Sequence, residues 1–334
     1  YVLLFFLAPI IANFYEDLRL VSIIRVIGLT SVIKALGSTQ GAYLSKCQHY
    51  LGQSKVYFLS LVGASIFALC CAWLGFGFWS LVIKSLSTMI FLAVGWWIIS
   101  PWKPQLEFSQ ESLKRLFPFG SKILATSLFD GLFNNIYSLI IGKVYNAQSL
   151  GYYTRARGFL DLPDNSVRGV ITGVLFPALS YYQNDDEKLK NYYKRGLVLL
   201  AFVLYPIYSI LFFSAKPMII ILITSKWLLA VPLLKILCIK TLFYPFESIN
   251  GNILYVKGRS NYVLISTIIR RGIFILLITL TIRFGIKGLM WGLVADSLIV
   301  SALYFLFAKK VFRYGILEQL LDIKKPIIIL ILPC

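Results

Sequence analysis

The chain has 334 residues, of which 58% are hydrophobic and 14% charged, and its mean hydropathy is +0.78. Soluble domains average roughly 45–50% apolar and about 25% charged residues, so this composition excludes an ordinary soluble domain and indicates a membrane protein. The 33 Lys and Arg residues outnumber the 14 Asp and Glu residues, which gives a net charge of +19. His49 is the single histidine, which excludes chemistry that needs a histidine pair, and we expect neither a metal nor a cofactor.

Apolar stretches of about twenty residues, the length of a membrane-spanning helix, recur along the chain. The alternating pattern of an outer-membrane barrel is missing from the sequence, so we predict an all-α, polytopic transmembrane bundle of about eleven helices. The chain begins inside one apolar run and ends in a run too short to cross a bilayer, which predicts a fragment of a longer protein. The predicted spans are 1–15 (partial), 20–45, 56–75, 77–99, 117–142, 160–182, 196–222, 228–255, 261–283, 286–308 and 326–334 (partial).

The basic residues between these spans predict the orientation. Sixteen of the 33 Lys and Arg residues fall in alternate gaps, against eight in the intervening gaps, and the positive-inside rule places the first set in the cytoplasm. The regular alternation between gaps rich and poor in basic residues supports the number of spans, because one missed helix would disrupt this alternation. The predicted cytoplasmic set is Lys46, Lys55, Lys103, Lys114, Arg115, Lys188, Lys190, Lys194, Arg195, Lys257, Arg259, Lys309, Lys310, Arg313, Lys324 and Lys325.

The remaining nine basic residues lie inside the apolar runs, where a charge that faces lipid costs a few kcal/mol. Snorkelling at helix ends explains some of them, and the others must face a cavity or a partner. The acidic residues at the same depth, Asp130, Asp161, Glu247 and Asp296, are about half as many. This excess of cations favours a cavity that attracts an anion. The nine are Arg25, Lys34, Lys84, Lys122, Arg168, Lys235, Lys240, Arg270 and Arg271.

Residues 150–182 form the most polar part of the chain. Within them Arg157, Asp161, Asp164 and Arg168 are spaced three or four apart, so on a helix they share one face. Such a charged stripe is unsuited to lipid and favours the wall of a cavity, with Arg155 at its mouth. Two roles stay open for the polar groups of the preceding span, contacts to a sugar or hydrogen bonds between helices: Asn134, Asn135 and Tyr137.

Buried carboxylates can carry a proton or a sodium ion, because burial disfavours their charged form. Asp130, Asp161 and Asp296 are therefore candidates for ion coupling. The alternative is that each carboxylate neutralises a nearby arginine.

Four motifs in residues 117–180 carry a family resemblance. They are PFG at 118–120, IGK followed by a tyrosine at 141–145, LGYY-x-RA at 150–156 and LFPALS at 175–180. The segment resembles polysaccharide exporters of the Wzx type, close to the colanic acid and teichuronic acid exporter branch, in the multidrug/oligosaccharidyl-lipid/polysaccharide flippase superfamily. Further matches at 8–15, 226–232 and 251–259 extend the resemblance over essentially the whole chain.

The resemblance implies about fourteen helices in two lobes around a central cavity, of which this chain would hold the third to the thirteenth. The corresponding domains are the remainder of an N-terminal bundle (1–99), a cytoplasmic linker (100–116), a C-terminal bundle (117–308) and the start of extra C-terminal helices (309–334). The implied activity is translocation, without covalent chemistry, of an undecaprenyl-pyrophosphate-linked oligosaccharide across a bacterial inner membrane. Expected partners are this polyprenyl-pyrophosphate-linked oligosaccharide, membrane lipids, and a polysaccharide polymerase with its assembly proteins; nucleic acid is not expected.

We expect cations of the cavity to bind the pyrophosphate, while the two bundles rock about the linker to give alternating access. The candidates for this anion site are Arg157, Arg168, Arg155, Arg25 and Lys34.

Three other functions are alternatives to this one. A multidrug-type antiporter of the same superfamily would favour acidic cavity groups for cationic drugs, which the excess of cations argues against. A membrane glycosyltransferase or polymerase needs a large soluble domain or a long loop, and no gap between the predicted spans is long enough. A non-transporting component of a polysaccharide assembly complex stays open.

Overall fold

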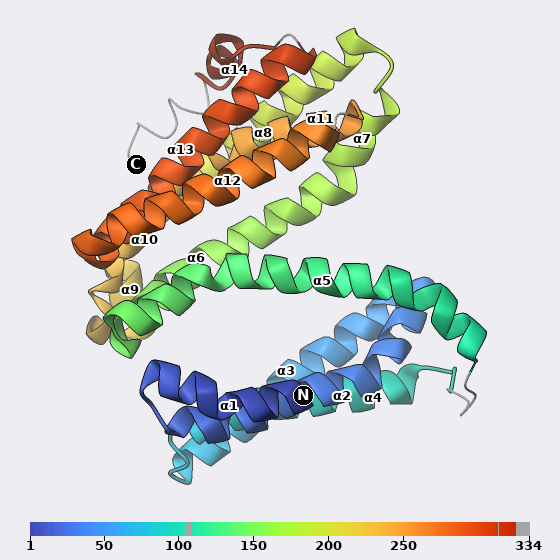
Figure 1. The fold of residues 1–334 in the computed structure, drawn as a ribbon, viewed down its shortest axis with the longest axis vertical. Helices are drawn as coiled ribbons and strands as arrows, with labels where there is room; N and C mark the ends of the chain where they lie inside the picture. The colour runs from blue at the N-terminus through green and yellow to red at the C-terminus, as the bar shows by residue number, and fades with distance from the viewer. Residues whose placement is uncertain (104–108, 259, 313, 325–334) are drawn as a thin grey trace. The chain divides into compact units, whose positions relative to one another are not determined.

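The computed structural model describes residues 1–103, 109–258, 260–312 and 314–324, and every regular element among them is helical. The all-α class predicted from the sequence is confirmed. The chain divides into two compact units, Tyr1–Gly131 (unit 1) and Leu132–Cys334 (unit 2). The division falls inside helix α5 (Gln110–Ile140), which begins seven residues before the predicted span because its first turns are polar (Figure 1).

Unit 1 contains α1 (Val2–Tyr15), α2 (Arg19–Lys46), α3 (Tyr50–Trp73) and α4 (Trp79–Ile99), followed by the first part of α5. Helix α4 packs against both α2 and α3 (Figure 1). Glycines allow the close approach, since a methyl group added to Gly37 of α2 would lie 3.0 Å from the backbone of Ala93 in α4. Small residues serve this purpose in lipid, where apolar surface alone does not drive helices together.

Unit 2 contains the end of α5 and a longer series of helices, several of which are short or interrupted. Helices α12 and α13 run side by side, and α13 also packs against α10 and α11 (Figure 1). The elements are η1 (Ile141–Tyr145, a π-helical turn), α6 (Ala147–Val170), η2 (Ile171–Leu175, a second π-helical turn), α7 (Phe176–Tyr181), α8 (Asp186–Phe213), α9 (Ala215–Ile223), η3 (Ser225–Trp227), α10 (Ala230–Thr241), α11 (Tyr244–Val256), α12 (Ser260–Thr281), η4 (Ile282–Phe284), α13 (Gly285–Phe312) and α14 (Ile316–Asp322).

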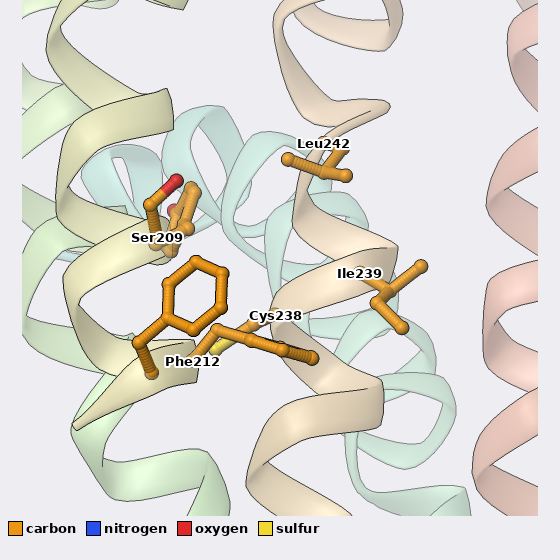
Figure 2. A pocket seen from close by; sticks show the side chains of 7 residues that line it. Ser209, Phe212, Cys238, Ile239 and Leu242 are labelled. Atoms are coloured by element: carbon orange, nitrogen blue, oxygen red, sulfur yellow. The ribbon is translucent and has the colours of Figure 1, made fainter. Parts of the chain in front are cut away.

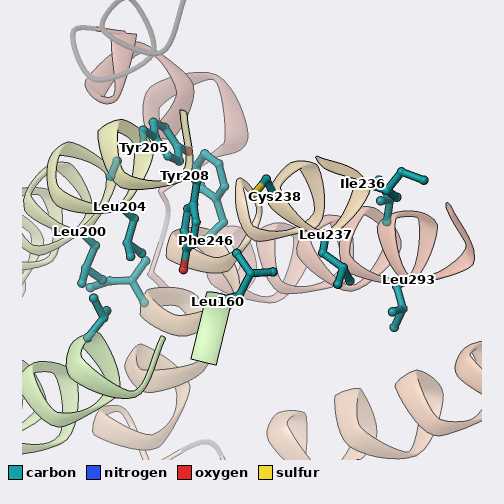
Figure 3. Close-up of a cluster of buried hydrophobic side chains, with 14 of the residues drawn as sticks. Leu160, Leu200, Leu204, Tyr205, Tyr208, Ile236, Leu237, Cys238, Phe246 and Leu293 are labelled. Carbon is teal, nitrogen blue, oxygen red and sulfur yellow. The ribbon is translucent and has the colours of Figure 1, made fainter. Parts of the chain in front are cut away.

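The core of unit 2 is built from large apolar side chains of several helices. Figure 3 shows Leu160 of α6 close to Phe246 of α11, with Leu200 and Leu204 of α8, Leu237 of α10 and Leu293 of α13 in the same cluster. All six side chains are buried.

A buried polar network joins α8, α11 and α14. Tyr193 Oη donates to Asn250 Oδ1 at 2.5 Å, and Asn250 Nδ2 donates to Gln319 Oε1 at 3.0 Å. All three side chains are fully buried. A salt bridge of 2.9 Å between Lys194 Nζ and Asp322 Oδ1 adds a second tie between α14 and α8.

Three further predicted spans differ from the structure. The span predicted at 196–222 begins earlier, at Asp186, and is interrupted at Ser214 between α8 and α9. The span predicted at 160–182 begins earlier, because the polar residues from Ala147 onward are already helical and line a cavity rather than lipid. The span predicted at 228–255 is interrupted between α10 and α11, where Pro245 lies in the first turn of α11 and supplies no backbone N–H. The run predicted at 326–334 lies outside the described residues.

Five helical stretches of the described chain are long and apolar enough to cross a membrane: α2, α3, α4, α8 and the stretch Ile265–Lys310 that covers most of α12 and α13. Helix α1 is apolar but shorter. Among the remaining helices of unit 2, α7, α9, α10, α11 and α14 are shorter than a membrane span, and α6 carries the polar residues expected around a polar cavity.

Candidate functional site

A polar cavity of about 520 Å³ lies within unit 2, between α5, α6, α10, α12 and α13. Small-molecule sites occupy roughly 300–1,000 Å³, so the size suits a small polar ligand or the head of a larger one. Its lining residues are Phe133, Asn134, Tyr137, Tyr153, Arg157, Leu160, Asp161, Asp164, Asn165, Leu237, Lys240, Thr241, Thr267, Arg270, Arg271, Phe274, Leu293, Asp296 and Tyr304.

Arg157 organises the side of the cavity formed by α5 and α6. Its Nη1 donates to the backbone oxygen of Asn134 at 3.1 Å, and its Nε lies 3.7 Å from Asp161 Oδ1. The guanidinium therefore connects the two helices. It remains partly exposed to the cavity, so it keeps donors for a ligand.

Arg270 of α12 connects the partly buried carboxylate of Glu247 with the buried carboxylate of Asp296 on the other side of the cavity. Its Nη1 lies 3.3 Å from Glu247 Oε2 of α11, and its Nη2 lies 3.6 Å from Asp296 Oδ2 of α13. The planar guanidinium, with its fork of donors, suits such a double contact. Three helices are thereby tied together at the depth where α10 and α11 are interrupted.

Two buried polar atoms of the cavity wall have no hydrogen-bond partner among the described residues. They are Tyr137 Oη of α5 and Asp296 Oδ1 of α13. A buried polar atom without a partner is destabilising by about 1–3 kcal/mol. Both atoms are therefore available to a polar ligand.

Lys240 lies in the last turn of α10, where a cation also interacts favourably with the helix dipole. Among the described residues, no carboxylate oxygen lies within 4.0 Å of its ammonium group. Two other charged groups of the cavity wall have their own contacts. Asp164 of α6 accepts a hydrogen bond from Tyr208 Oη, and the Arg271 guanidinium lies 4.1 Å from the ring centre of Phe133. Lys240 is thus a cavity cation that forms no salt bridge among the described residues.

The charge balance of the cavity is more even than the sequence suggests. Four cations and three carboxylates line it, and Glu247 joins them through Arg270. The excess counted from the sequence was larger because it included intramembrane cations of unit 1. In the described part of the chain, no group of three His, Cys, Asp or Glu side chains comes together as a metal site would require.

Comparison with known proteins identifies the family. The profile of the family described as "Polysaccharide biosynthesis protein" matches residues 1–232. The chain belongs to this family. Teichuronic acid biosynthesis protein TuaB of Bacillus subtilis is 26% identical over 78% of this chain and 54% of its own length. Lipopolysaccharide biosynthesis protein WzxC of Escherichia coli is 24% identical over 97% of this chain and 67% of its own.

This family member spans about half the length of TuaB and two thirds of that of WzxC. Its fold is similar to that of the lipid II flippase MurJ in an inward closed conformation, with a TM-score of 0.73 at 19% identity over 99% of this chain and 72% of that one. The resemblance to Wzx-type polysaccharide exporters is confirmed. The chain is therefore an all-α, multi-pass protein of the bacterial inner membrane.

The structure separates the residues predicted to bind the anion. Arg157 lines the cavity, whereas the exposed Arg155 lies with its guanidinium 5.2 Å from the ring centre of Trp227. Arg25 and Lys34 belong to unit 1, where Arg25 Nε donates to the backbone oxygen of Phe5 and Lys34 is exposed. The side chain of Arg168 lies outside the described part of the structure.

The candidates for sugar contact and ion coupling are also divided. Asn134 and Tyr137 line the cavity, but Asn135 is exposed and does not. Asp161 and Asp296 line it as well, each beside an arginine. The side chain of Asp130 lies outside the described residues.

Sequence reasoning did not select three of the cavity cations, Lys240, Arg270 and Arg271, as site residues. It counted them as intramembrane charges, which is the signal that could have found them. Two patterns indicate a polar site between helices more strongly than any one charge does. One is a pair of adjacent arginines in the middle of a span, and the other is a lysine followed closely by Pro245 and Glu247.

Proposed function

We propose that the full-length protein translocates a polyprenyl-pyrophosphate-linked oligosaccharide, with undecaprenyl as the expected carrier, from the cytoplasmic to the outer face of the inner membrane. The observation that carries this proposal is the polar cavity among membrane helices, with Arg157 and Lys240 in its wall. The fold likeness to a lipid II flippase and the family's role in polysaccharide biosynthesis support it. The activity is transport without covalent chemistry, so the protein is not an enzyme.

In this mechanism cations hold the pyrophosphate, and neutral polar groups contact sugars. Arg157 offers a planar fork for phosphate oxygens, and Lys240 offers a point charge. Tyr137 Oη and the side chain of Asn134 provide hydrogen bonds to hydroxyl groups. Rocking of the two helical bundles about the linker would then expose the site alternately to each side.

Asp161 and Asp296 are the described candidates for coupling to an ion. Asp296 lies against Arg270, so a proton or sodium ion that binds there must compete with the guanidinium. Ion binding would loosen the contact between α12 and α13, which is the kind of local change that can bias a two-state transporter.

The test is translocation of a fluorescent lipid-pyrophosphate oligosaccharide in liposomes that contain the full-length protein. Arg157→Ala and Lys240→Ala should each weaken the apparent affinity at least about tenfold, because a hydrogen bond to a charged group contributes about 1.5–3 kcal/mol. Arg283→Ala is the matched control, since Arg283 is exposed and outside the cavity. If the unmodified protein does not translocate the lipid-linked sugar, the proposed function is refuted. If both variants translocate it as well as the unmodified protein does, the proposed site is refuted.

A multidrug-type antiporter is the second candidate, and the near-even charge balance of the cavity is the observation that favours it. Asp161 and Asp164 face the cavity, where they can attract a cation. The same liposomes distinguish the two functions. Efflux of a cationic dye without movement of the lipid-linked sugar would favour the antiporter; movement of neither would favour a non-transporting component of a polysaccharide assembly complex.

A further inference from the structure

A second pocket of unit 2, the α8–α10 crevice, lies between these two helices. It is lined by Tyr208, Ser209, Phe212, Cys238, Ile239 and Leu242, with Phe213 at the end of α8. Figure 2 shows Phe212 of α8 beside Cys238 and Ile239 of α10, and nearly all of the lining surface is apolar. The volume is about 170 Å³, close to the roughly 150 Å³ of a dry apolar cavity that binds benzene, so the crevice takes a segment of one hydrocarbon chain.

The surroundings of the crevice indicate what fills it. Helix α8 is long and apolar enough to cross the membrane, and its side chains Phe202, Ile210 and Phe213 are exposed. In an inner-membrane protein such side chains face lipid. Water does not fill an apolar pocket readily, and an empty one loses its dispersion contacts, so a hydrocarbon chain is the favoured occupant.

A lysine lies at the end of the crevice. Lys235 is three and four residues before Cys238 and Ile239, which places it one helical turn from both, and its Nζ lies 5.0 Å from the ring centre of Phe212. Among the described residues, no carboxylate oxygen lies within 4.0 Å of it. Lys235 lies in the first half of α10, which begins on the side predicted to be extracytoplasmic, so its long side chain can extend toward the headgroup region there.

We propose that the α8–α10 crevice binds one acyl chain of an anionic phospholipid in the outer leaflet, with Lys235 on the lipid phosphate. The apolar lining of the crevice suits the acyl chain, and the ammonium group of Lys235 suits the phosphate. These two parts of the site follow one another in the same order as the two parts of the lipid. This site is distinct from the polar cavity, although α10 contributes Leu237, Lys240 and Thr241 to that cavity. The proposal rests on the membrane location of α8 and α10 and does not depend on the transport function.

Tyr208 connects the lipid site to the cavity. Its ring lines the crevice, while its hydroxyl group donates to Asp164 in the cavity wall. A lipid chain against the ring restricts the ring's movement and so holds the Asp164 contact in place. Tyr208 is therefore a positioning residue for the cavity.

The test is photo-crosslinking of the full-length protein, in bilayer nanodiscs, with phosphatidylglycerol that carries a diazirine on one acyl chain. Peptide mapping should find the label on α8 and α10 at the crevice. Unlabelled phosphatidylglycerol should compete, and zwitterionic phosphatidylethanolamine should compete much less. Lys235→Ala should reduce labelling about fivefold, the effect of one lysine near an anionic membrane surface, and Lys235→Arg should retain it.

Two further variants separate occupancy from folding. Ile239→Trp should fill the crevice and abolish its labelling, and Lys287→Ala, an exposed lysine on the same predicted side, should leave labelling unchanged. Labelling is compared only between variants that elute as one monodisperse species at the same volume in size-exclusion chromatography. Uniform labelling of all lipid-facing helices, equal competition by phosphatidylethanolamine, or full labelling of Lys235→Ala would overturn the proposal. Stronger competition by undecaprenyl phosphate than by phosphatidylglycerol would overturn the assigned occupant.

Discussion

Unit 1 is packed through small residues and unit 2 through large ones. In unit 1 the buried positions include Ala8, Ala12, Ala64 and Ala68, whereas those of unit 2 include many leucines and tyrosines such as Tyr193. Small residues bring helix backbones close together, and large residues hold them apart. A polar cavity therefore arises where helices are already held apart and polar side chains replace part of a large-residue core.

The dependence of unit 2 on internal charges gives the largest expected effect. Arg270→Ala would leave Glu247 and Asp296 without their cation, which destabilises a buried pair by roughly 3–5 kcal/mol. We expect the low end of this range, because the Arg270 side chain is 35% exposed. Thermal unfolding in detergent should show the loss.

Lys84→Ala in unit 1 is the control for this prediction. Lys84 is an intramembrane cation too, but it is exposed and has no salt bridge among the described residues. Its removal should change the free energy of unfolding by less than about 0.5 kcal/mol. Equal losses for the two variants would contradict the comparison between the units.

The close packing of unit 1 predicts a steric effect. Gly37→Val places new atoms against the backbone of Ala93 and should destabilise the protein by about 1–3 kcal/mol. Gly272→Val in α12 of unit 2 is the matched change, because no atom lies within 4 Å of the position a methyl group would take there. Melting temperatures measured side by side should fall only for Gly37→Val.

Buried amides should respond in opposite directions in the two units. Asn250→Leu removes the hydrogen bonds that Asn250 makes with Tyr193 Oη and Gln319 Oε1, which should destabilise unit 2 by about 1–3 kcal/mol. Gln40→Leu in unit 1 removes a buried amide whose two polar atoms have no hydrogen-bond partner among the described residues, so it should be neutral or stabilising. Denaturation of both variants under one condition tests the sign, and a shared loss would refute the contrast.

The smallest effect concerns pH, and here the two units should behave alike. Hydrogen bonds from Arg19 lower the pKa of Asp17 in unit 1, and the backbone N–H of Lys188 lowers that of Asp185 in unit 2. A lowered pKa gives stability above the unfolded value of about 3.9 that is lost as the pH falls through the folded value. As the pH is lowered below about 4, the melting temperature should therefore decrease. The decrease should be smaller in Asp17→Asn and Asp185→Asn. Equal acid sensitivity of these variants and the unmodified protein would argue against this origin of the pH dependence.

Run length predicted most of the fold. The predicted spans 20–45 and 77–99 agree closely with α2 and α4, because about twenty apolar residues in a row have one stable arrangement in lipid. The early start of α6 and the interruption between α10 and α11 were not predicted. Both depend on where polar backbone and side chains find partners in the folded unit, and hydropathy does not report this.

The candidate site was predictable only where its residues lie on one helix. Arg157 and Asp161 are four residues apart, so their shared face follows from the sequence, and the structure places both in the cavity wall. Lys240, Arg270 and Asp296 come from three different helices. Their meeting depends on tertiary packing, for which the spacing of residues in one chain holds no signal.

The π-helical turn η2 has a consequence for how the length of this chain can vary among relatives. A π-helical turn holds one more residue than an α-helical turn, so a deletion within Ile171–Leu175 could be absorbed without breaking the helix. Because a π-helical turn and an α-helical turn with one residue fewer cover nearly the same rotation, the helix beyond the deletion would keep its orientation, and the fully buried Leu179 would stay in the core. Relatives that keep this core should therefore tolerate the loss of one residue in η2, and an alignment gap there would mark a chain in which the π-helical turn has become α-helical.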